Sequence, residues 1–217
     1  QELKVGIHIH LAETKQEFND ILKQYGKTPT KHIYDLGLFQ VPVLAAHCVY
    51  LNEEDIQLIA EVEAGVAHNP TSNMKLASGV APVHQLLKAG VKVGIGTDGT
   101  ASNNNLNMLE EMHITSLLHK VSRSDPTSIP AYQALQMGTI GGAQVLNLAQ
   151  EIGTLEVGKK ADIILIDLDQ PHLYPCYDLV ANLIYSAQGS DVITSIIDGK
   201  IIMKDRQVLT MDEERIK

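Results

Sequence analysis

Residues 91–98 read VKVGIGTD, a short apolar run that ends in a threonine and an aspartate. We expect a buried strand from Val91 to Gly96, because the run is apolar on both faces and Gly90 separates it from a helical segment. Asp98 then stands at the carboxyl end of that strand. A short strand that follows a helix and is apolar on both faces is typical of a parallel sheet.

The same strand–helix unit occurs three times before residue 91. Thr14 with Glu17, and Asn52, are helix-capping signals that mark where two of the helices begin. We expect strands over 5–11, 41–49 and 65–68, and helices over 15–24, 30–36, 53–63, 80–87, 106–121 and 130–148. This alternation predicts a parallel sheet with right-handed crossovers, hence a doubly wound fold or a (β/α) barrel. Four units make half of an eight-stranded barrel.

The character of the chain changes after Leu148. The segment 153–158 is rich in turn residues, and strands are expected over 161–168, 192–198 and 200–204. Asp198-Gly199 between the last two is a hairpin signal. We therefore divide the chain into a half-barrel, residues 1–150, and a segment of a small β domain, residues 151–217.

The composition excludes several classes of protein. The chain has 217 residues, 44% of them hydrophobic and 20% charged, as in an ordinary globular protein. Its 17 Lys and Arg against 26 Asp and Glu give a net charge of −9, which disfavours binding to nucleic acid or to an anionic membrane surface. No apolar run reaches the ~18 residues of a membrane span.

Two further features concern location and chain length. Cys48 and Cys176 are too few for a disulfide framework, which fits a reducing, cytoplasmic compartment. The opening residues Gln1-Glu2-Leu3-Lys4 are not a signal peptide and include no initiator methionine. We therefore expect further residues upstream.

Polar side chains follow the predicted strands at their carboxyl ends: His10 and Glu13, His47, His68 and Asp98. In a parallel barrel these ends share one rim, where barrel enzymes carry their active sites. Neutral imidazoles with a carboxylate suit Zn²⁺, and similar ligands suit iron or manganese. A single histidine at a strand end is more often structural. Several polar groups on one rim favour a metal site, whereas we expect His119, in the predicted helix 106–121, to lie on the surface or in packing.

His8 precedes His10 by two residues, so both imidazoles face the same side of the first strand. They form either a His-x-His metal pair on the first strand of a barrel, or a single ligand, His10, with His8 one layer deeper. We favour the second interpretation, because the first requires four more strand–helix units after Asp98. Only helices and a β segment follow it.

Four segments carry a resemblance to a known family: residues 10–14 (HLAET), 46–49 (AHCV), 68–76 (HNPTSNMKL) and 96–104 (GTDGTASNN). They resemble successive strand ends of the amidohydrolase superfamily. Within it they are most similar to the 5-methylthioadenosine/S-adenosylhomocysteine deaminases and their chlorohydrolase and guanine deaminase relatives. The resemblance implies the C-terminal half of a metal-dependent hydrolase TIM-type (β/α)8 barrel, strands five to eight. Residues 153–163 resemble the return into that family's small β-sandwich.

The resemblance also implies roles for site residues. His10 would be a metal ligand, and Asp98 would bind the metal and take a proton from the water. Glu13 would contact a ring nitrogen of the substrate, and His47 would touch the metal-bound water. The motif that begins at His68 would shape the pocket. Ser102 and residues 103–105 would hold the loop that carries Asp98.

One departure from the family bears on metal binding and partners. Family members have an upstream barrel half with a His-x-His pair on strand one, and these 217 residues do not include it. We therefore expect this chain alone to be inactive and free of metal, and to pair with the other barrel half or to form a homo-oligomer.

The intact protein is expected to deaminate an adenine nucleoside by means of a metal-bound hydroxide. Two alternatives stay open. One is a triazine or guanine aminohydrolase of the same superfamily, and the other is a truncated, non-catalytic binding homologue. A doubly wound nucleotide-binding domain is disfavoured, because no Gly-x-Gly-x-x-Gly follows the first strand.

Overall fold

The computed structural model describes residues 5–216 and contains two separate four-stranded sheets. Residues 1–4, on which the expectation of upstream residues rests, lie outside the described part, as does residue 217. Within residues 5–216, no helix is both long and apolar enough to span a membrane.

The first sheet is parallel and its strands follow one another in chain order. It consists of β1 (Ile7–Leu11), β2 (Val43–His47), β3 (Gly65–His68) and β4 (Lys92–Ile95). His10 lies opposite Ala46, Ala46 opposite Ala67, and Ala67 opposite Gly94. A doubly wound sheet reverses its strand order at a switch point, so this unbroken order indicates a barrel segment.

Helices connect the four strands and continue after the last one. They are α1 (Lys15–Tyr25), α2 (Pro29–Asp35), α3 (Glu53–Glu61), α4 (Pro70–Lys75), α5 (Val83–Lys88), α6 (Thr100–Asn103) and α7 (Met108–Arg123), with a 3₁₀ turn, η1 (Leu38–Gln40). The predicted caps are confirmed: Thr14 Oγ1 accepts from the N–H of Glu17, and Asn52 forms a capping box with Asp55. The short helices α4 and α6 are absent from the sequence-based prediction.

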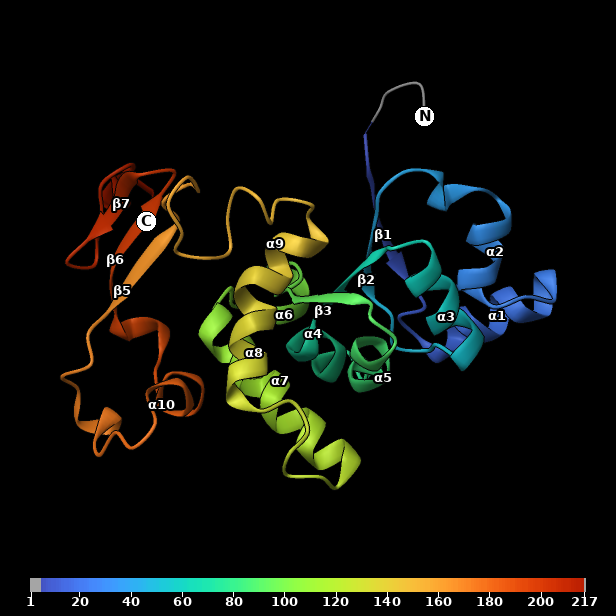
Figure 1. The fold of residues 1–217 in the computed structure, drawn as a ribbon, viewed down its shortest axis with the longest axis horizontal. Coiled ribbons are helices and arrows are strands. Elements are labelled where there is room, and N and C mark those ends of the chain that lie inside the picture. The colour runs from blue at the N-terminus through green and yellow to red at the C-terminus, as the bar shows by residue number, and fades with distance from the viewer. Residues whose placement is uncertain (1–4, 217) are drawn as a thin grey trace.

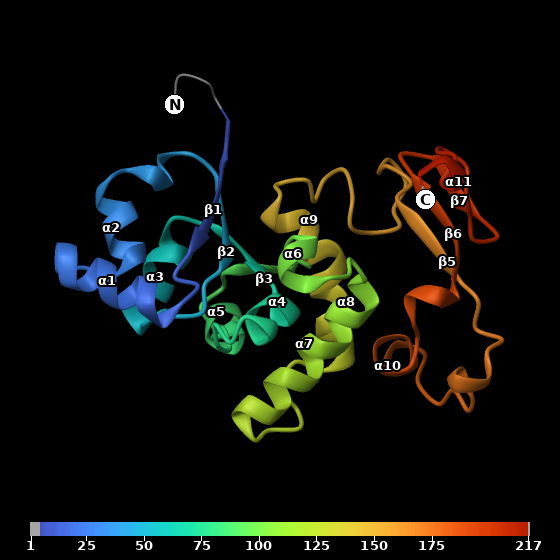
Figure 2. The same ribbon diagram turned by 180° about the vertical axis from the view of Figure 1, so that it is seen from behind.

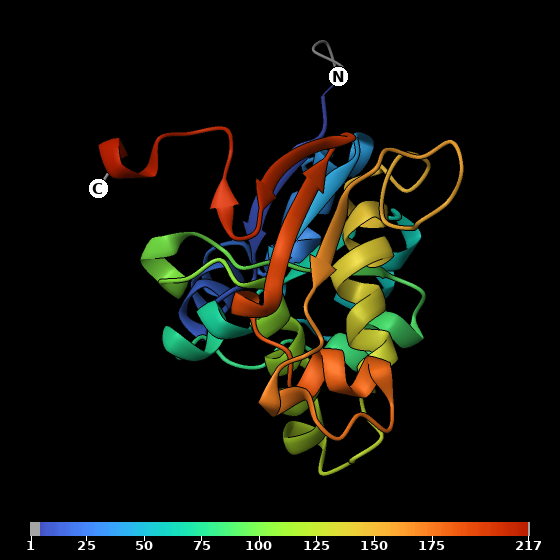
Figure 3. The ribbon, with the colours of Figure 1, turned by 90° about the vertical axis from the view of Figure 1, so that its left-hand side faces the viewer.

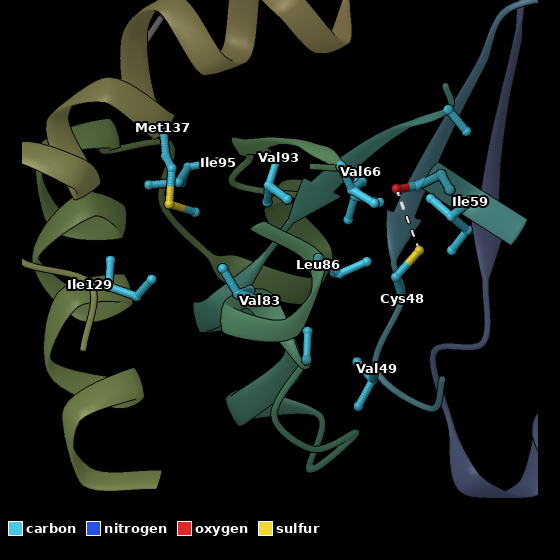
Figure 4. Packing of buried hydrophobic residues seen from close by; sticks show 14 of the residues in the cluster. Cys48, Val49, Ile59, Val66, Val83, Leu86, Val93, Ile95, Ile129 and Met137 are labelled. Atoms are coloured by element: carbon cyan, nitrogen blue, oxygen red, sulfur yellow. Dashed lines mark hydrogen bonds between the residues drawn. The ribbon is translucent and has the colours of Figure 1, made fainter. Parts of the chain in front are cut away.

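The core lies between this sheet and the connecting helices. Val66 of β3 and Val93 of β4 point toward Leu86 of α5 (Figure 4). Cys48 is fully buried beside Ile59 of α3, and its Sγ lies 3.9 Å from the carbonyl of Ala45. Burial of this apolar face fixes the strands and thereby the positions of their carboxyl ends.

The opposite face of the sheet receives a different helix. Residues 130–148, predicted as helix, form α8 (Ala131–Gln136), a π-helical turn, η2 (Met137–Gly141), and α9 (Gly142–Val145). α9 lies on the other side of β3 from α4 and α5 (Figures 1 and 2). A Cβ on Gly65 would lie 2.8 Å from the Cβ of Val145, so only glycine admits the helix there. By register, Gly65 shares this face with His8, and α9 therefore covers it toward the amino end of β3.

The second sheet is antiparallel and begins after residue 160. It contains β5 (Ile163–Ile166), β6 (Val192–Ile197), β7 (Lys200–Lys204) and β8 (Gln207–Val208). The predicted hairpin at Asp198 and Gly199 is present, with φ of 51° and 74°. Helix α10 (Leu179–Tyr185) packs against α7 and α8, and Figure 3 shows it at one end of the sheet. The remaining short elements are η3 (Pro171–Leu173), η4 (Gly189–Asp191) and α11 (Glu213–Ile216). We keep the division into residues 1–150 and 151–217 as a proposal.

Candidate metal and catalytic site

Three polar side chains meet at the carboxyl ends of the parallel strands. His10 is the last residue but one of β1, His47 is the last residue of β2, and Asp98 follows β4. One ligand atom from each lies within 4.8 Å of the others, and the two imidazole centroids are 5.3 Å apart. Among residues 5–216, this is the one such group of three His, Cys, Asp or Glu side chains. The structure therefore places these three predicted site residues together.

His47 is buried and held in one orientation. Its backbone has a φ of 74°, in the left-handed region that non-glycine residues rarely adopt. Nδ1–H donates to Oδ1 of Asn73 at 2.8 Å. Nε2 consequently carries a lone pair, and it lies 3.8 Å from Oε2 of Glu13. Strained backbone of this kind is often found where a side chain must be aimed at a site.

Glu13 is half-buried at the same rim. Its Oε1 accepts a hydrogen bond from Ser78 Oγ at 3.2 Å. The loop that carries it is fixed by Glu17, whose two carboxylate oxygens accept the N–H groups of Ala12 and Glu13 at 2.9 and 2.8 Å. The carboxylate of Glu13 is thus presented toward His47 by contacts on both its side chain and its backbone.

Asp98 stands in the loop after β4 with a φ of 60°. Oδ2 accepts from Ser72 Oγ and Oδ1 from the N–H of Gly99, both at 2.7 Å. Partial burial raises the pKa of Asp98, but the hydrogen bonds from Ser72 and Gly99, with His47 and Ser102, outweigh it and hold that pKa below its ordinary value. Asp98 is therefore an ionised carboxylate, the form that binds a cation.

A buried carboxylate ties together the two loops behind Asp98. Glu111 of α7 is only 1% exposed, and burial raises its pKa against the hydrogen bonds that lower it. Its Oε1 accepts from Asn103 Nδ2 at 2.8 Å and its Oε2 from the N–H of Thr71 at 3.3 Å. Asn103 Nδ2 also donates to the carbonyl of Thr97 at 2.7 Å. Asn103 thus bonds to the residue before Asp98, in line with the role predicted for residues 103–105.

His68 ends β3 but lies outside the cluster. It is fully buried, and its Nε2 lies 3.2 Å from Nε2 of His119. The neighbouring Asn69 lies against Gly96, where a Cβ would be 2.4 Å from Asn69 Oδ1. His68 thus faces the interior, and Asn69 lines the cavity beside the cluster.

A cavity of about 250 Å³ lies next to the cluster, on the face that carries His8 and His10. Its wall includes Ala46 and Ala67 of the sheet, Asp98, and Leu146 at the end of α9. A larger groove of about 760 Å³, along α3 and α5, contains none of the candidate residues. The smaller cavity is therefore the one that two of the candidate residues, His10 and Asp98, line.

The chain matches the amidohydrolase family over residues 1–202. This protein chain belongs to the amidohydrolase family. A 5-methylthioadenosine/S-adenosylhomocysteine deaminase of Desulforamulus reducens is 60% identical over 98% of this chain and 49% of its own length. This amidohydrolase chain spans about half the length of the curated relatives that it matches.

Solved structures agree with this assignment. An adenosine deaminase from Xanthomonas campestris with bound zinc superposes with a TM-score of 0.95 at 38% identity, over 99% of this chain and 49% of that one. The atrazine chlorohydrolase of Arthrobacter aurescens TC1, complexed with zinc, gives 0.90 at 28% identity over 99% of this chain and 48% of its own. The predicted fold, half of a TIM-type barrel with part of a second β domain, is confirmed.

The donor set of this amidohydrolase fits a divalent metal. Two imidazoles and an ionised carboxylate are ligands that zinc accepts, and iron or manganese accepts a similar set. His47 offers Nε2 as a lone pair because Asn73 occupies Nδ1. His8 lies on the same face as His10 but is not a member of the group.

Sequence reasoning overlooked three polar residues that contact the site: Ser72, Asn73 and Ser78. Ser72 and Asn73 lie within the quoted segment 68–76, for which a pocket-shaping role is predicted. Both are fully buried, and Ser78 is 4% exposed. Small polar residues soon after a strand end indicate that these positions lie near the site. The sequence does not show which side chain each of them contacts, because this depends on the tertiary structure.

Proposed function

We propose that the protein containing this chain hydrolytically deaminates the adenine ring of a nucleoside of the S-adenosylhomocysteine or 5-methylthioadenosine type. Water adds to C6, the C6–N bond breaks, and ammonia leaves. The observation that carries the proposal is the position of Glu13 beside His47 and Asp98 at one strand rim. The names of the similar proteins support the same reaction.

His10 and Asp98 would hold a divalent metal, with zinc the first choice and iron or manganese the alternatives. Such an ion, when bound, lowers the pKa of its water from ~15.7 toward ~7 and so supplies hydroxide at neutral pH. The depressed pKa of Asp98 keeps that side chain anionic for both tasks, binding the cation and accepting a proton.

The proton transfers fall to Glu13 and Asp98. Glu13 donates a proton to a ring nitrogen, which makes C6 more electrophilic, and Asp98 carries one proton of the attacking water to the leaving amine. As the C6–N bond breaks, the remaining proton on the added oxygen returns to Glu13 and leaves a C6 carbonyl. The tautomer of His47 refines its role. Nε2 is an acceptor here, so it orients the attacking water. Stabilising the tetrahedral oxygen requires the imidazole first to gain a proton.

Two other functions are weaker candidates. A triazine or guanine aminohydrolase would use Glu13 in the same way. The greater identity to the adenosine deaminase, 38% against 28% for the chlorohydrolase, favours the nucleoside. A non-catalytic binding homologue would not need an ionised Asp98 with two dedicated hydrogen-bond donors.

The proposal is tested by ammonia release from the zinc-loaded protein that contains this chain. S-adenosylhomocysteine and 5-methylthioadenosine should be turned over, and guanine and atrazine should not. Asp98→Asn should abolish turnover while the nucleoside still binds. Turnover of guanine alone, or wild-type activity in the Asp98→Asn variant, would refute the assignment.

We further propose that the exposed face around His8 and His10, with the edge of β1, pairs with the remaining half of the barrel or with a second copy of the chain. Within the described residues, β1 has a strand partner on one side only. An unpaired strand edge readily accepts another strand. The proposed location is the cytoplasm, since neither Cys48 nor Cys176 is in a disulfide.

A further inference from the structure

One short segment contacts the three candidate catalytic groups. It runs from Ser72 in α4 to Ser78, just after the end of that helix. Ser72 Oγ lies 2.7 Å from Asp98 Oδ2. Asn73 Oδ1 lies 2.8 Å from His47 Nδ1. Ser78 Oγ lies 3.2 Å from Glu13 Oε1. His47 ends β2, and Glu13 and Asp98 lie in the loops after β1 and β4, so one segment contacts residues from three different strand ends.

The contact from Asn73 determines the tautomer of His47. The amide oxygen of Asn73 faces the ring and can only accept, so in this amide orientation the bond at 2.8 Å places a proton on Nδ1. His47 is 1% exposed, and water does not compete for the bond. Nε2 is therefore left as a lone pair directed toward Glu13, which is the form needed to bind a metal or to accept from water.

The contact from Ser78 distinguishes the two oxygens of Glu13. Its hydroxyl donates to Oε1, so Oε2 is the oxygen that remains outside this contact. Oε2 is also the oxygen nearer to His47, at 3.8 Å from Nε2. Ser78 thereby selects the oxygen from which a proton leaves.

The contact from Ser72 works together with a backbone amide. Ser72 takes Oδ2 of Asp98 while the N–H of Gly99 takes Oδ1, so the carboxylate plane is fixed by two donors. Each oxygen keeps a further lone pair for a cation or a proton.

The segment is itself anchored at several points. The N–H of Ser78 donates to the carbonyl of Asn73 at 2.8 Å, which closes the turn after α4. Glu111 accepts from the N–H of Thr71 at 3.3 Å. Lys75 donates to the carbonyl of Ala101 at 3.3 Å and to the side chain of Asn104. These contacts fix the segment that carries the Ser72, Asn73 and Ser78 side chains.

We propose that Ser72–Ser78 is a positioning segment: Ser72 orients the carboxylate of Asp98, Asn73 sets the tautomer of His47, and Ser78 selects the proton-bearing oxygen of Glu13. The catalytic consequence rests on the proposed function, whereas the structural claim about His47 does not depend on it.

The structural claim is tested by ¹⁵N NMR of the imidazole of His47 in the protein that contains this chain. We expect a protonated Nδ1 and a bare Nε2 in the wild type. Asn73→Ala should give a mixture of tautomers, and Asn73→Asp, which keeps an acceptor, should retain the wild-type form. Asn19→Asp, on the exposed face of α1, is the matched control. An Nε2–H tautomer in the wild type, or an unchanged spectrum in Asn73→Ala, overturns the proposal. If the alanine variant does not fold, the tautomer seen in the wild-type spectrum alone tests the claim about His47.

The catalytic consequence is tested with Ser78→Ala. Loss of the hydrogen bond that orients the Glu13 carboxyl should lower kcat by up to about tenfold with little change in KM. Ser78→Thr restores the hydroxyl and should recover most of kcat, and the exposed Ser122→Ala of α7 should behave as the wild type. Equal loss in both Ser78 variants, or loss in KM alone, contradicts a positioning role. If the wild type turns over no adenine nucleoside, the proposed function is wrong. The NMR experiment still tests whether Asn73 sets the tautomer of His47.

Discussion

His68 and His119 meet inside the protein with their Nε2 atoms 3.2 Å apart. A hydrogen bond between two such atoms needs a proton on one ring and a lone pair on the other, so at least the accepting imidazole is neutral. Burial lowers the pKa of His68 well below its ordinary value. Burial, with Arg123 and His84 nearby, lowers that of His119 to about 4.

Stability should therefore depend on pH below neutrality. In the unfolded chain these histidines titrate near their ordinary pKa of about 6.5, so between about 6.5 and about 4 the unfolded state binds more protons. The free energy of unfolding is complete above this window and falls as the pH falls through it, by up to about 1.4 kcal/mol per pH unit for each histidine. Urea unfolding at about pH 7.5 and pH 5 should show this loss.

His119→Gln provides the control for that experiment, because the amide keeps a donor for His68 and does not titrate. Its loss of stability between the two pH values should be smaller than that of the wild type. Equal losses would show that the acid sensitivity has another origin.

Glu111→Gln should weaken both the fold and the metal site. The carboxylate accepts from two donors, and an amide would turn an N–H toward one of them. We expect a loss of about 1–3 kcal/mol in the free energy of unfolding and roughly 10- to 100-fold weaker zinc binding. Denaturant titration and chelator competition measure the two. The half-buried neighbour Glu110→Gln is the control, and equal effects in both variants would remove Glu111 from the support of Asp98.

His10 and His8 should contribute unequally to metal binding. Both face the same cavity, but only His10 belongs to the group whose ligand atoms lie within 4.8 Å. Elemental analysis of the protein that contains this chain should find zinc lost in His10→Ala and better retained in His8→Ala. The isolated 217-residue chain should hold less than one tightly bound metal ion per chain. The reverse order of the two variants would exclude His10 as a ligand.

Gly65→Ala should destabilise the protein. The new methyl would meet Val145 at 2.8 Å, and such overpacking costs about 1–3 kcal/mol. Gly142→Ala has room, with its nearest atom, the carbonyl oxygen of Met137, at 3.9 Å, and a helical φ, so it should be neutral or stabilising. Thermal unfolding of the two variants checks this, and comparable melting temperatures would argue against close packing of α9 on the sheet.

The strands were largely predictable from the sequence, because their apolar runs end at clear turn signals. The strands 65–68 and 200–204 have the predicted bounds, and the hairpin at Asp198-Gly199 follows from its turn residues. Periodicity could not distinguish a doubly wound sheet from a barrel. Both share the same local pattern, and only the pairing of β1 to β4 separates them.

Other features depend on contacts that leave no periodic signal. Helix α4 has six residues, begins with Pro70, and has no side-chain N-cap hydrogen bond, so its segment has the sequence character of a loop. Helix α10 has only seven residues, and it is placed by packing against α7 and α8. The meeting of His10, His47 and Asp98 follows from strand-end positions. The left-handed backbone of His47 and Asp98, by contrast, is imposed by tertiary structure.

The position of α9 on the sheet limits the routes by which substrate can enter and product can leave. Val145 and Leu146 cover the sheet near the start of β3. They therefore close the cavity beside His10 at that end. In a completed barrel, nucleoside and water would enter at the strand tips, and ammonia would leave through that same mouth. Departure of the product would then have to precede arrival of the next molecule.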